Sequence, residues 1–335
     1  MDMLADTSPQ VMYPLTALIS FLLVKLASVI SRKQGLVDIP GERQSHTLPT
    51  VTGCGIGLVA ALIVTSLLFR RPMTGDAWVS LVLPGIAVLS LMGWMDDRRP
   101  LSNRFRLFVQ LIVSYALIAY LALNGWRIGW PMIVAGGLAM VWVMNFYNFM
   151  DGSHGMAGFQ GVFSGLLLGG VFLFAGDTAL AVPAFLLAAV CAGFLPLNFP
   201  RPRVFMGDSG SVPLGFAIAA LITLGISRDL FGLPLAMLVL AVFLVDSSLT
   251  LFSRAIRGER WYTAHRQHMY QRLIGQGWTH SRVLFLYQAV NIILIIPVVM
   301  LVMMYPEQAW LLAGSVFLLL ITGWYLASLK FGVRK

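Results

Sequence analysis

Residues 130–155 read WPMIVAGGLAMVWVM followed directly by NFYNFMDGSHG. The first part is apolar all around a helix, which is typical of a helix surrounded by apolar material. A bilayer core requires about 20 apolar residues per helix. The second part begins where the apolar run ends and brings two asparagines, an aspartate and a histidine close together. The stretch therefore predicts a membrane span with polar groups gathered at one end.

The composition extends this pattern to the whole chain. Of its 335 residues, 58% are hydrophobic and 11% are charged, and the mean hydropathy is +0.82. Soluble domains carry about 25% charged residues, so this chain lacks the polar surface that such a domain needs. Cys54 and Cys191 lie in apolar runs, which indicates small buried side chains rather than a disulfide or a metal site. The predicted fold class is all-α, a polytopic transmembrane helical bundle.

The apolar runs predict about eleven spans in a single integral membrane domain that covers residues 1–335. Their approximate ranges are 11–30, 53–69, 78–95, 105–124, 131–149, 157–175, 179–197, 211–227, 234–252, 283–304 and 309–328. The first residues, MDMLADTSPQ, are acidic rather than basic. The first span is therefore expected to be a retained anchor and not a cleaved signal peptide.

Basic residues fall unevenly on the two sides of these spans when the N-terminus is placed outside and the C-terminus in the cytoplasm. One set of loops and the tail carry Arg32, Lys33, Arg43, Arg98, Arg99, Arg104, Arg201, Arg203, Arg254, Arg257, Arg260, Arg266, Arg272, Arg282, Lys330, Arg334 and Lys335. The other set has only Arg70, Arg71, Arg127 and Arg228. Because cytoplasmic loops are enriched in lysine and arginine, the first set is predicted to be cytoplasmic. This distribution accounts for the net charge of +9 without a nucleic-acid partner.

The acids and histidines follow the same asymmetry. Asp38, Glu42, Asp96, Asp97, Asp151, Asp208, Glu259 and all five histidines fall on the predicted cytoplasmic side. We therefore expect the catalytic loops, near 31–52, 96–104, 150–156, 198–210 and 253–282, to face the cytoplasm.

Asp96 and Asp97 stand at the end of a span in GWMDDRRPLSNRFR, residues 93–106. Adjacent carboxylates raise each other's proton affinity unless a cation lies nearby. Mg²⁺ prefers carboxylate oxygens and keeps several waters and phosphates. The alternative is a helix end at which these acids pair with Arg98 and Arg99, and this motif alone leaves both interpretations open.

Asn145, Asn148 and Asp151 are spaced by three and share one helix face. Such a polar stripe either contacts a ligand or forms hydrogen bonds between helices. Asp151 favours the ligand, since acids within membrane spans are costly and usually functional. Asp246, inside the apolar run LVLAVFLVDSSLTLFSR, is instead expected to be a structural partner for a buried asparagine or arginine.

Two further segments carry chemistry. In NFPRPRVFMGDSGS, residues 198–211, Asp208 either binds a ligand or caps the next helix, and the nearby arginines suit phosphate oxygens. In RAIRGERWYTAHRQHMYQRL, residues 254–273, His265 and His268 suit a metal site, an acid–base pair or a phosphate clamp. The alternative for this second segment is a basic stretch that lies on anionic lipid.

Together these groups indicate phosphoryl transfer at the membrane surface, because that chemistry depends on positioning and charge neutralisation. In their order and spacing they resemble the polyprenyl-phosphate N-acetylhexosamine-1-phosphate transferases, which belong to glycosyltransferase family 4 and include the phospho-N-acetylmuramoyl-pentapeptide transferase. The motifs that carry the resemblance are D-x-P-x-x-R-x-x-H at 38–46, MDD at 95–97, N-x-x-N-x-x-D-G at 145–152, FMGDxGS at 205–211 and AHRxH at 264–268.

The resemblance implies a reaction, a cofactor and a location. An N-acetylhexosamine-1-phosphate would pass from a UDP-sugar to undecaprenyl phosphate, with UMP released and Mg²⁺, or Mn²⁺ in its place, as cofactor. The product would start an O-antigen-type lipopolysaccharide or another cell-wall polymer. The implied location is a bacterial inner membrane, with membrane lipids as further partners and a homodimer as one possible assembly.

The resemblance also implies roles for individual residues. The implied metal ligands are Asp208 and Asp97, and the implied catalytic residues are Asp96, Asp97, Asp151 and His268. The residues implied for the nucleotide-sugar are Asn148, Asp151, Asn198, Phe205, Arg266 and His268. Lipid-phosphate or loop support is expected from Arg43, His46 and His265.

The chain departs from the family pattern at two positions. The second acid of the family's D-G-x-D-G is His154 here, which puts the mode of uracil recognition in doubt. The family's His-x-His-His is His268-Met269-Tyr270-Gln271 here, which resembles enzymes that start O-antigen-type polysaccharides with a deoxy-amino sugar or N-acetylglucosamine.

Three other classes of protein compete with this interpretation. A transporter of a phosphorylated or nucleotide-linked solute would also place charges in spans, but near the midplane and commonly in inverted repeats. A CDP-alcohol phosphotransferase would carry D-G-x-x-A-R, whereas Asp151-Gly152 leads here into SHGMAG. A purely structural membrane protein would not need so many polar motifs on one face.

Overall fold

The computed structural model describes residues 8–39, 49–70, 77–260 and 265–332. Its helices are α1 (Pro9–Lys33), α2 (Gly55–Leu68), α3 (Leu83–Arg98), α4 (Asn103–Leu123), α5 (Trp130–Phe149), α6 (Met156–Phe174), α7 (Thr178–Asn198), α8 (Asp208–Ser227), α9 (Leu233–Leu238), α10 (Ala241–Ile256), α11 (Met269–Gly275), α12 (His280–Val290), α13 (Ile296–Met304) and α14 (Ala309–Lys330). The π-helical segments η3 (Trp78–Val82) and η4 (Asn291–Ile295) continue into α3 and α13, and the 3-10 turn η5 (Pro306–Gln308) precedes α14. The polytopic all-α prediction is confirmed.

Nine of the eleven predicted spans are helices long and apolar enough to cross a membrane within the described part of the chain. The two exceptions are instructive. The range 53–69 contains only the 14 residues of α2, because the backbone before it pairs with another loop: Cys54 N donates to Phe205 O and Gly55 N to Met206 O. The range 234–252 is divided into α9 and α10.

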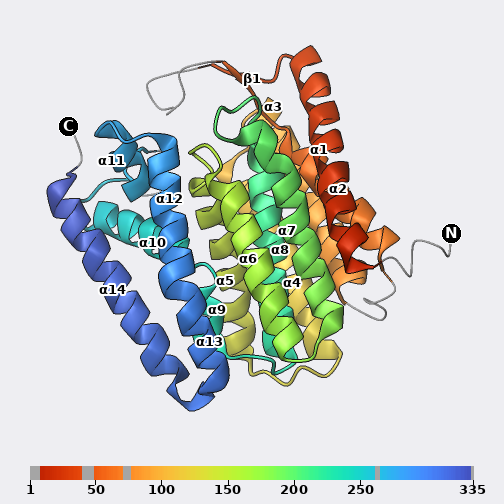
Figure 1. The fold of residues 1–335 in the computed structure, drawn as a ribbon, viewed down its shortest axis with the longest axis vertical. Helices are drawn as coiled ribbons and strands as arrows, with labels where there is room; N and C mark the ends of the chain where they lie inside the picture. Colours follow the sequence, from red (N-terminus) through yellow and green to blue (C-terminus); the bar gives the residue numbers. More distant parts are fainter. Residues whose placement is uncertain (1–7, 40–48, 71–76, 261–264, 333–335) are drawn as a thin grey trace.

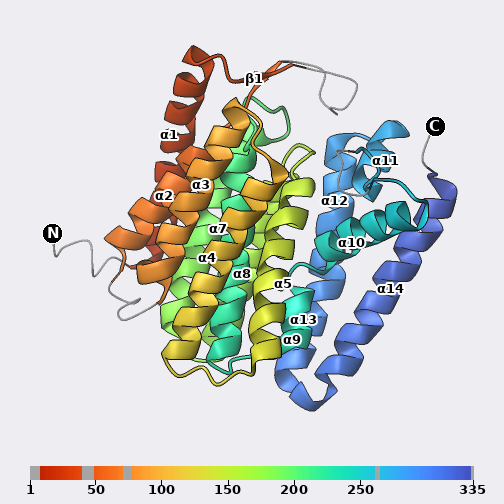
Figure 2. The same ribbon diagram turned by 180° about the vertical axis from the view of Figure 1, so that it is seen from behind.

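The break between α9 and α10 is stabilised by a polar side chain from α6. Leu240 leaves helical geometry, with φ −124° and ψ 20°, and the carbonyl of Val239 accepts a hydrogen bond of 3.3 Å from Gln160 Nε2. Asn291 of η4 donates in turn to Gln160 Oε1 at 2.8 Å. Broken helices persist inside membranes where neighbouring groups satisfy the freed backbone. As a result α10 lies across the direction of the other helices (Figures 1 and 2).

The helices form a main bundle of α1 to α8 and a second group that includes α10, α12, α13 and α14 (Figure 1). Helix α8 is the centre of the main bundle and packs against α3 and α5. Of the apolar stretch of α8, 89% of the residues are buried inside the protein, compared with 11% for the apolar stretch of Pro306–Lys330. The start of α8 is therefore a fixed point inside the protein, whereas α14 presents most of its surface to the surroundings.

The loops that carry the sequence motifs gather at one end of the molecule, the upper end in Figure 1. There the short antiparallel strands β1 (Val37–Asp38) and β2 (Thr50–Val51) pair, and Val51 also bridges to Val204 in the loop before α8. Helix α1 begins at the opposite end and α14 finishes at the motif end (Figures 1 and 2). The start of α1 and the end of α14 therefore lie on opposite faces. Which of the two faces is cytoplasmic stays a prediction.

Candidate active site

A polar cavity of about 270 Å³ lies at the motif end of the bundle. Its wall is formed by Asp38, Thr52, Asn148, Phe149, Asp151, Gly152, Ser153, His154, Asn198, Phe205, Gly207, Asp208, Arg266, Tyr270 and Gln271. Six residues predicted from the sequence therefore meet in one place, although they come from three separate segments of the chain: Asn148, Asp151, Asn198, Phe205, Asp208 and Arg266. Arg43 and His46 lie outside the described residues.

Asp208 is held at the first turn of α8 by Asp97 of α3. Asp97 Oδ1 accepts from Asp208 N at 3.0 Å, and Asp97 Oδ2 accepts from Ser209 N at 3.2 Å. The first amides of a helix lack intrahelical partners and carry partial positive charge, so a carboxylate is favourable there. Gly207 makes the approach feasible, since its φ is +70° and a methyl group on it would lie 2.6 Å from Asp97 Oδ2.

Arg106 of α4 joins two of the acids, a contact that the sequence did not assign. Its Nη1 lies 2.8 Å from Asp96 Oδ2 and 2.9 Å from Asp208 Oδ2. Arg98, one of the two partners in the alternative interpretation of this motif, instead contacts Gln34 and lies over the Trp94 ring. Several arginines follow the acid pair in the sequence, and their spacing does not single out Arg106. Only the packing of α4 beside α3 and α8 selects it.

These carboxylates fit a divalent cation shared with a phosphate. Asp96 and Asp208 both reach the same guanidinium nitrogen, so one cation can contact both. Over the described ranges of the chain, no group of three or more histidine, cysteine or acidic side chains is arranged to hold a metal ion. Mg²⁺ commonly uses one or two carboxylates and completes its shell with water and substrate phosphates. The metal role predicted for Asp208 and Asp97 therefore remains a proposal, with Asp96 as a further ligand.

Close packing between α3 and α8 fixes the position of these acids. A methyl group on Gly93 would lie 2.3 Å from the backbone carbonyl of Asp208 and 2.5 Å from Ser209 N. Gly93→Ala should therefore push the helices apart, lower the free energy of unfolding by about 1–3 kcal/mol and weaken any activity that depends on Asp208. Thermal unfolding in detergent measures the first effect.

The matched control is Gly170→Ala on α6, where an added methyl group meets nothing within 4 Å. Its unfolding temperature should equal or exceed that of the wild type, because alanine is favoured over glycine inside a helix by up to about 1 kcal/mol. Equal unfolding temperatures for Gly93→Ala and the wild type would contradict the packing argument.

The predicted polar stripe on α5 divides into two parts. Asn148 lines the cavity and accepts from Ser211 Oγ of α8 at 2.8 Å, and Asp151 follows at the end of the helix. Asn145 instead donates to Gln110 Oε1 of α4 at 2.7 Å, which is a structural bond between helices. Burial, and then the charges of Asp208 and Asp97, raise the pKa of Asp151 well above its usual value. A carboxyl group in this environment is a candidate for function.

Asn198 and Phe205 are held by the loop before α8. Asn198 Oδ1 accepts from Gly155 N at 2.7 Å, and its Nδ2 donates to Val204 O at 2.9 Å. Phe205 N donates to Val51 O at 2.7 Å. Asn198 thus joins two loops of the cavity wall, while strand β2 positions the ring of Phe205.

An aromatic wall completes the cavity. The ring of His154 stacks on His280 with centroids 3.8 Å apart and an interplanar angle of 7°, and on Phe205 at 6.3 Å. Ser153 Oγ lies 2.9 Å from His280 Nδ1. His280 had no role in the sequence prediction, because it follows the other motifs and belongs to none of them. Flat rings of this kind suit the face of a nucleobase.

The loop before α11 carries two histidines. His268 is 3% exposed and stacks on Phe149 with centroids 5.9 Å apart, so the side chain lies behind the cavity wall. His265 lies 4.7 Å from the His268 ring. Burial, followed by the charges of His268 and Arg254, lowers the pKa of His265 to about 3, and burial also lowers the pKa of His268. Both imidazoles are therefore neutral at pH 7, and the predicted contact of His268 with the sugar stays a prediction.

The depressed pKa of His265 predicts a pH effect on stability. Between about pH 6.5 and pH 3 the unfolded chain binds a proton at this position that the folded chain does not, so stability falls as the pH falls through this window. His265→Asn should reduce the loss of unfolding temperature between pH 7.5 and pH 5.5. An unchanged loss in the variant would contradict the assignment.

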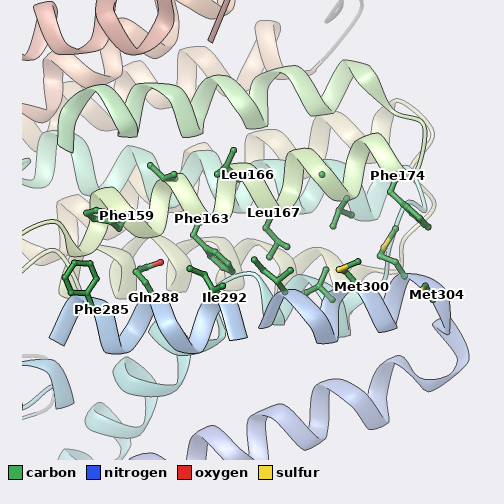
Figure 3. Close-up of a pocket in the computed structure, with 16 residues that line it drawn as sticks. Phe159, Phe163, Leu166, Leu167, Phe174, Phe285, Gln288, Ile292, Met300 and Met304 are labelled. Carbon is green, nitrogen blue, oxygen red and sulfur yellow. The ribbon is translucent and has the colours of Figure 1, made fainter. Parts of the chain in front are cut away.

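A larger cavity of about 820 Å³ lies along the side of the bundle, between α6 and α12–α13 (Figure 3). Its wall is apolar except for Gln288, and it runs from Phe159 and Phe285 at one end to Phe174 and Met304 at the other. It contains no titratable side chain. The chemistry therefore belongs to the smaller polar cavity.

Comparison with known proteins agrees with this geometry. Residues 79–226 match glycosyl transferase family 4. The match covers less than half of the chain, and it agrees with the family that the ordered motifs predicted. It covers Asp96, Asp97, Asn148, Asp151 and Asp208, and it ends before the loop that carries His265 and His268.

Several bacterial relatives are similar over most of their length. A probable undecaprenyl-phosphate N-acetylglucosaminyl 1-phosphate transferase of Bacillus subtilis is 25% identical, over 92% of this chain and 87% of its own. The undecaprenyl-phosphate alpha-N-acetylglucosaminyl 1-phosphate transferase of Escherichia coli K12 is 28% identical, over 78% of this chain and 75% of its own. A decaprenyl-phosphate N-acetylglucosaminephosphotransferase of Mycobacterium leprae is 29% identical, over 81% and 78%.

Proposed function

We propose that the protein transfers an N-acetylhexosamine-1-phosphate from a UDP-sugar to a polyprenyl phosphate, with N-acetylglucosamine as the first sugar to test. One observation carries the proposal. Asp208 lines the polar cavity together with aromatic and amide side chains, and it also bonds Arg106, at the end of a membrane bundle. This supports a site for a nucleoside beside one for phosphate and metal. The names of the relatives supply the polyprenyl acceptor and the sugar.

In the proposed reaction an oxygen of the lipid phosphate attacks the β-phosphorus of the donor. The bond from that phosphorus to the oxygen shared with the α-phosphorus breaks, and UMP leaves with this oxygen. A phosphate monoester has a second pKa near 6, so the acceptor is already largely dianionic at pH 7. Asp96 therefore has no need to act as a strong base, and its contact with Arg106 suits it to positioning the acceptor.

The cluster of acids and Arg106 addresses the main difficulty of the reaction, which is to bring two anionic phosphates together. Arg106 supplies a planar donor for phosphate oxygens, and Asp208 and Asp96 would hold Mg²⁺. When bound, Mg²⁺ neutralises charge that develops on the phosphate oxygens. Asp97 would act mainly by fixing the start of α8, because its oxygens accept from the backbone amides of Asp208 and Ser209.

The remaining residues of the cavity would bind the donor. Phe205 and the His154–His280 stack would offer flat faces for the uracil, and Asn148 and Asp151 line the same cavity. Arg266 would approach the diphosphate from the loop before α11. His265 would support that loop, and Arg43 and His46 keep their predicted role in lipid-phosphate or loop support.

The proposal includes the setting of the enzyme. The site would face the cytoplasm of a bacterium from its inner membrane, because the UDP-sugar is water-soluble and the basic loops lie at this end. The lipid-linked sugar would start a cell-surface polysaccharide of the O-antigen type.

The test is release of UMP by detergent-purified protein supplied with undecaprenyl phosphate, Mg²⁺ and each of several UDP-N-acetylhexosamines. We expect UMP that depends on both the lipid and one of the sugars, together with a lipid-linked sugar phosphate by mass spectrometry. Folded protein that releases no UMP from any donor would refute the transferase. Vesicle flux of an unaltered nucleotide-sugar would then favour a transporter.

A further inference from the structure

Asp246 of α10 lies inside an apolar segment and is only 3% exposed. Its carboxylate accepts hydrogen bonds from five uncharged donors. Oδ1 accepts from Met269 N at 2.7 Å, Trp324 Nε1 at 3.2 Å and Thr250 Oγ1 at 3.2 Å. Oδ2 accepts from Tyr287 OH at 2.7 Å and Tyr270 N at 3.4 Å. These donors belong to α10, α11, α12 and α14, so one carboxylate joins four helices.

Two of the five donors are the first amides of α11, which no carbonyl of that helix can satisfy. Asp246 therefore fixes the point at which the chain enters α11. Hydrogen bonds to a charged acceptor are stronger than those between neutral groups, and burial prevents water from competing for the carboxylate.

The start of α11 is connected in turn to the polar cavity. Tyr270 OH donates to Phe149 O at 3.0 Å, and a methyl group on Gly152 would lie 2.1 Å from that hydroxyl oxygen. Tyr270 and Gln271 both line the cavity. A displacement of α11 would thus move the cavity wall and the Phe149–Gly152 turn beside Asp151.

We propose that Asp246 is a positioning residue for the UDP-sugar site, and that it acts by holding the start of α11 against the cavity. The proposal rests on the proposed function for its kinetic consequences but not for its structural ones. It also gives α14 a part in the site, because Trp324 is one of the donors. The role requires a carboxylate, since in either orientation the NH₂ group of an asparagine would face a backbone N–H of α11, at Met269 or at Tyr270, which cannot accept.

The test compares Asp246→Asn with Thr250→Val. The control removes a donor to the same carboxylate, but this donor lies on α10 itself and does not reach the loop. Hydrogen–deuterium exchange of the folded proteins reports whether the first amides of α11 keep their hydrogen bonds. We expect amide exchange at residues 269–271 to rise at least tenfold in Asp246→Asn and to stay unchanged in Thr250→Val.

Kinetics then separate positioning from general loss of structure. In Asp246→Asn the KM for the UDP-sugar should rise at least tenfold, while the KM for the lipid phosphate stays within twofold. If Asp246→Asn does not fold, the double variant Tyr287→Phe with Trp324→Phe keeps the carboxylate and removes two donors, and its exchange at 269–271 should rise at least threefold.

Unchanged exchange at 269–271 in folded Asp246→Asn, or in the double variant, would overturn the proposal. An equal rise in KM for both substrates would also overturn it, because that result indicates a general disturbance. If the wild type transfers no sugar phosphate, the exchange data still decide the position of α11, so failure of the proposed function is separately visible.

Discussion

Asp208→Asn should reduce lipid-dependent UMP release by about 10³-fold or more, an increase of about 4 kcal/mol in the activation free energy. Asp208 starts α8, shares Arg106 with Asp96 and lines the polar cavity. An amide keeps the shape of the side chain but removes the charge that would hold Mg²⁺ and balance Arg106. Interactions with charge that develops in the transition state are commonly the largest contribution to catalysis.

The control for this variant is Asp177→Asn, which makes the same change at another helix start. Asp177 caps α7, with Leu180 N donating to it at 2.9 Å, and pairs with Arg228 at 2.7 Å. It lies at the opposite end of the bundle, where α6 is followed by α7. Its activity should equal that of the wild type. Wild-type turnover in Asp208→Asn would exclude the proposed metal site.

Asp151→Asn should lower kcat/KM for the UDP-sugar by about 10²-fold, because the side chain lines the cavity proposed for this donor, and misplacement of a substrate costs this much. The unfolding temperature should not fall together with the activity. Burial and the charges of Asp208 and Asp97 raise the pKa of Asp151, so at pH 7 its ionisation favours the unfolded chain. Removing that cost should leave the unfolding temperature equal to or above that of the wild type.

The comparison variant is Asn145→Ala on the same helix face. Asn145 contacts Gln110 and Val141 O rather than the cavity, so its loss should lower the unfolding temperature and leave kcat/KM within a few fold. Unfolding temperature and kcat/KM are measured on the same detergent preparations. Full activity in Asp151→Asn would remove this residue from the site.

Much of the fold follows from local pattern, since a helix in a bilayer needs only a sufficient run of apolar residues. The exceptions had causes that are distant in the sequence. The predicted span at 234–252 is broken because Gln160 satisfies the backbone carbonyl of Val239, while Asn291 donates to Gln160. Helix α2 starts late because residues 50–55 pair with the loop before α8.

In the candidate site, too, local sequence predicted some residues and only packing selected the others. The predicted residues Asn148, Asp151, Phe205 and Asp208 do line one cavity, because polar groups in an apolar chain are conspicuous and occur at the ends of spans. Arg106 and His280 were not assigned, since arginines and histidines are common in these loops and only packing distinguishes one from another. Asp246 was expected to pair with a buried asparagine or arginine, which was wrong: its donors are Thr250, Tyr287, Trp324 and two amides of α11, and they could not be identified from its neighbours in the chain.

The sequence by itself determined the membrane class and the helical architecture, and it predicted the family with which residues 79–226 agree, because hydropathy and the ordered motifs are properties of the chain. The tertiary structure alone decided which charges meet. Contacts such as Arg106 with Asp208, Asp97 with the amides of α8, and Asp246 with α11 join residues far apart in the chain. Their energies depend on distance and burial, which exist only once the helices have packed.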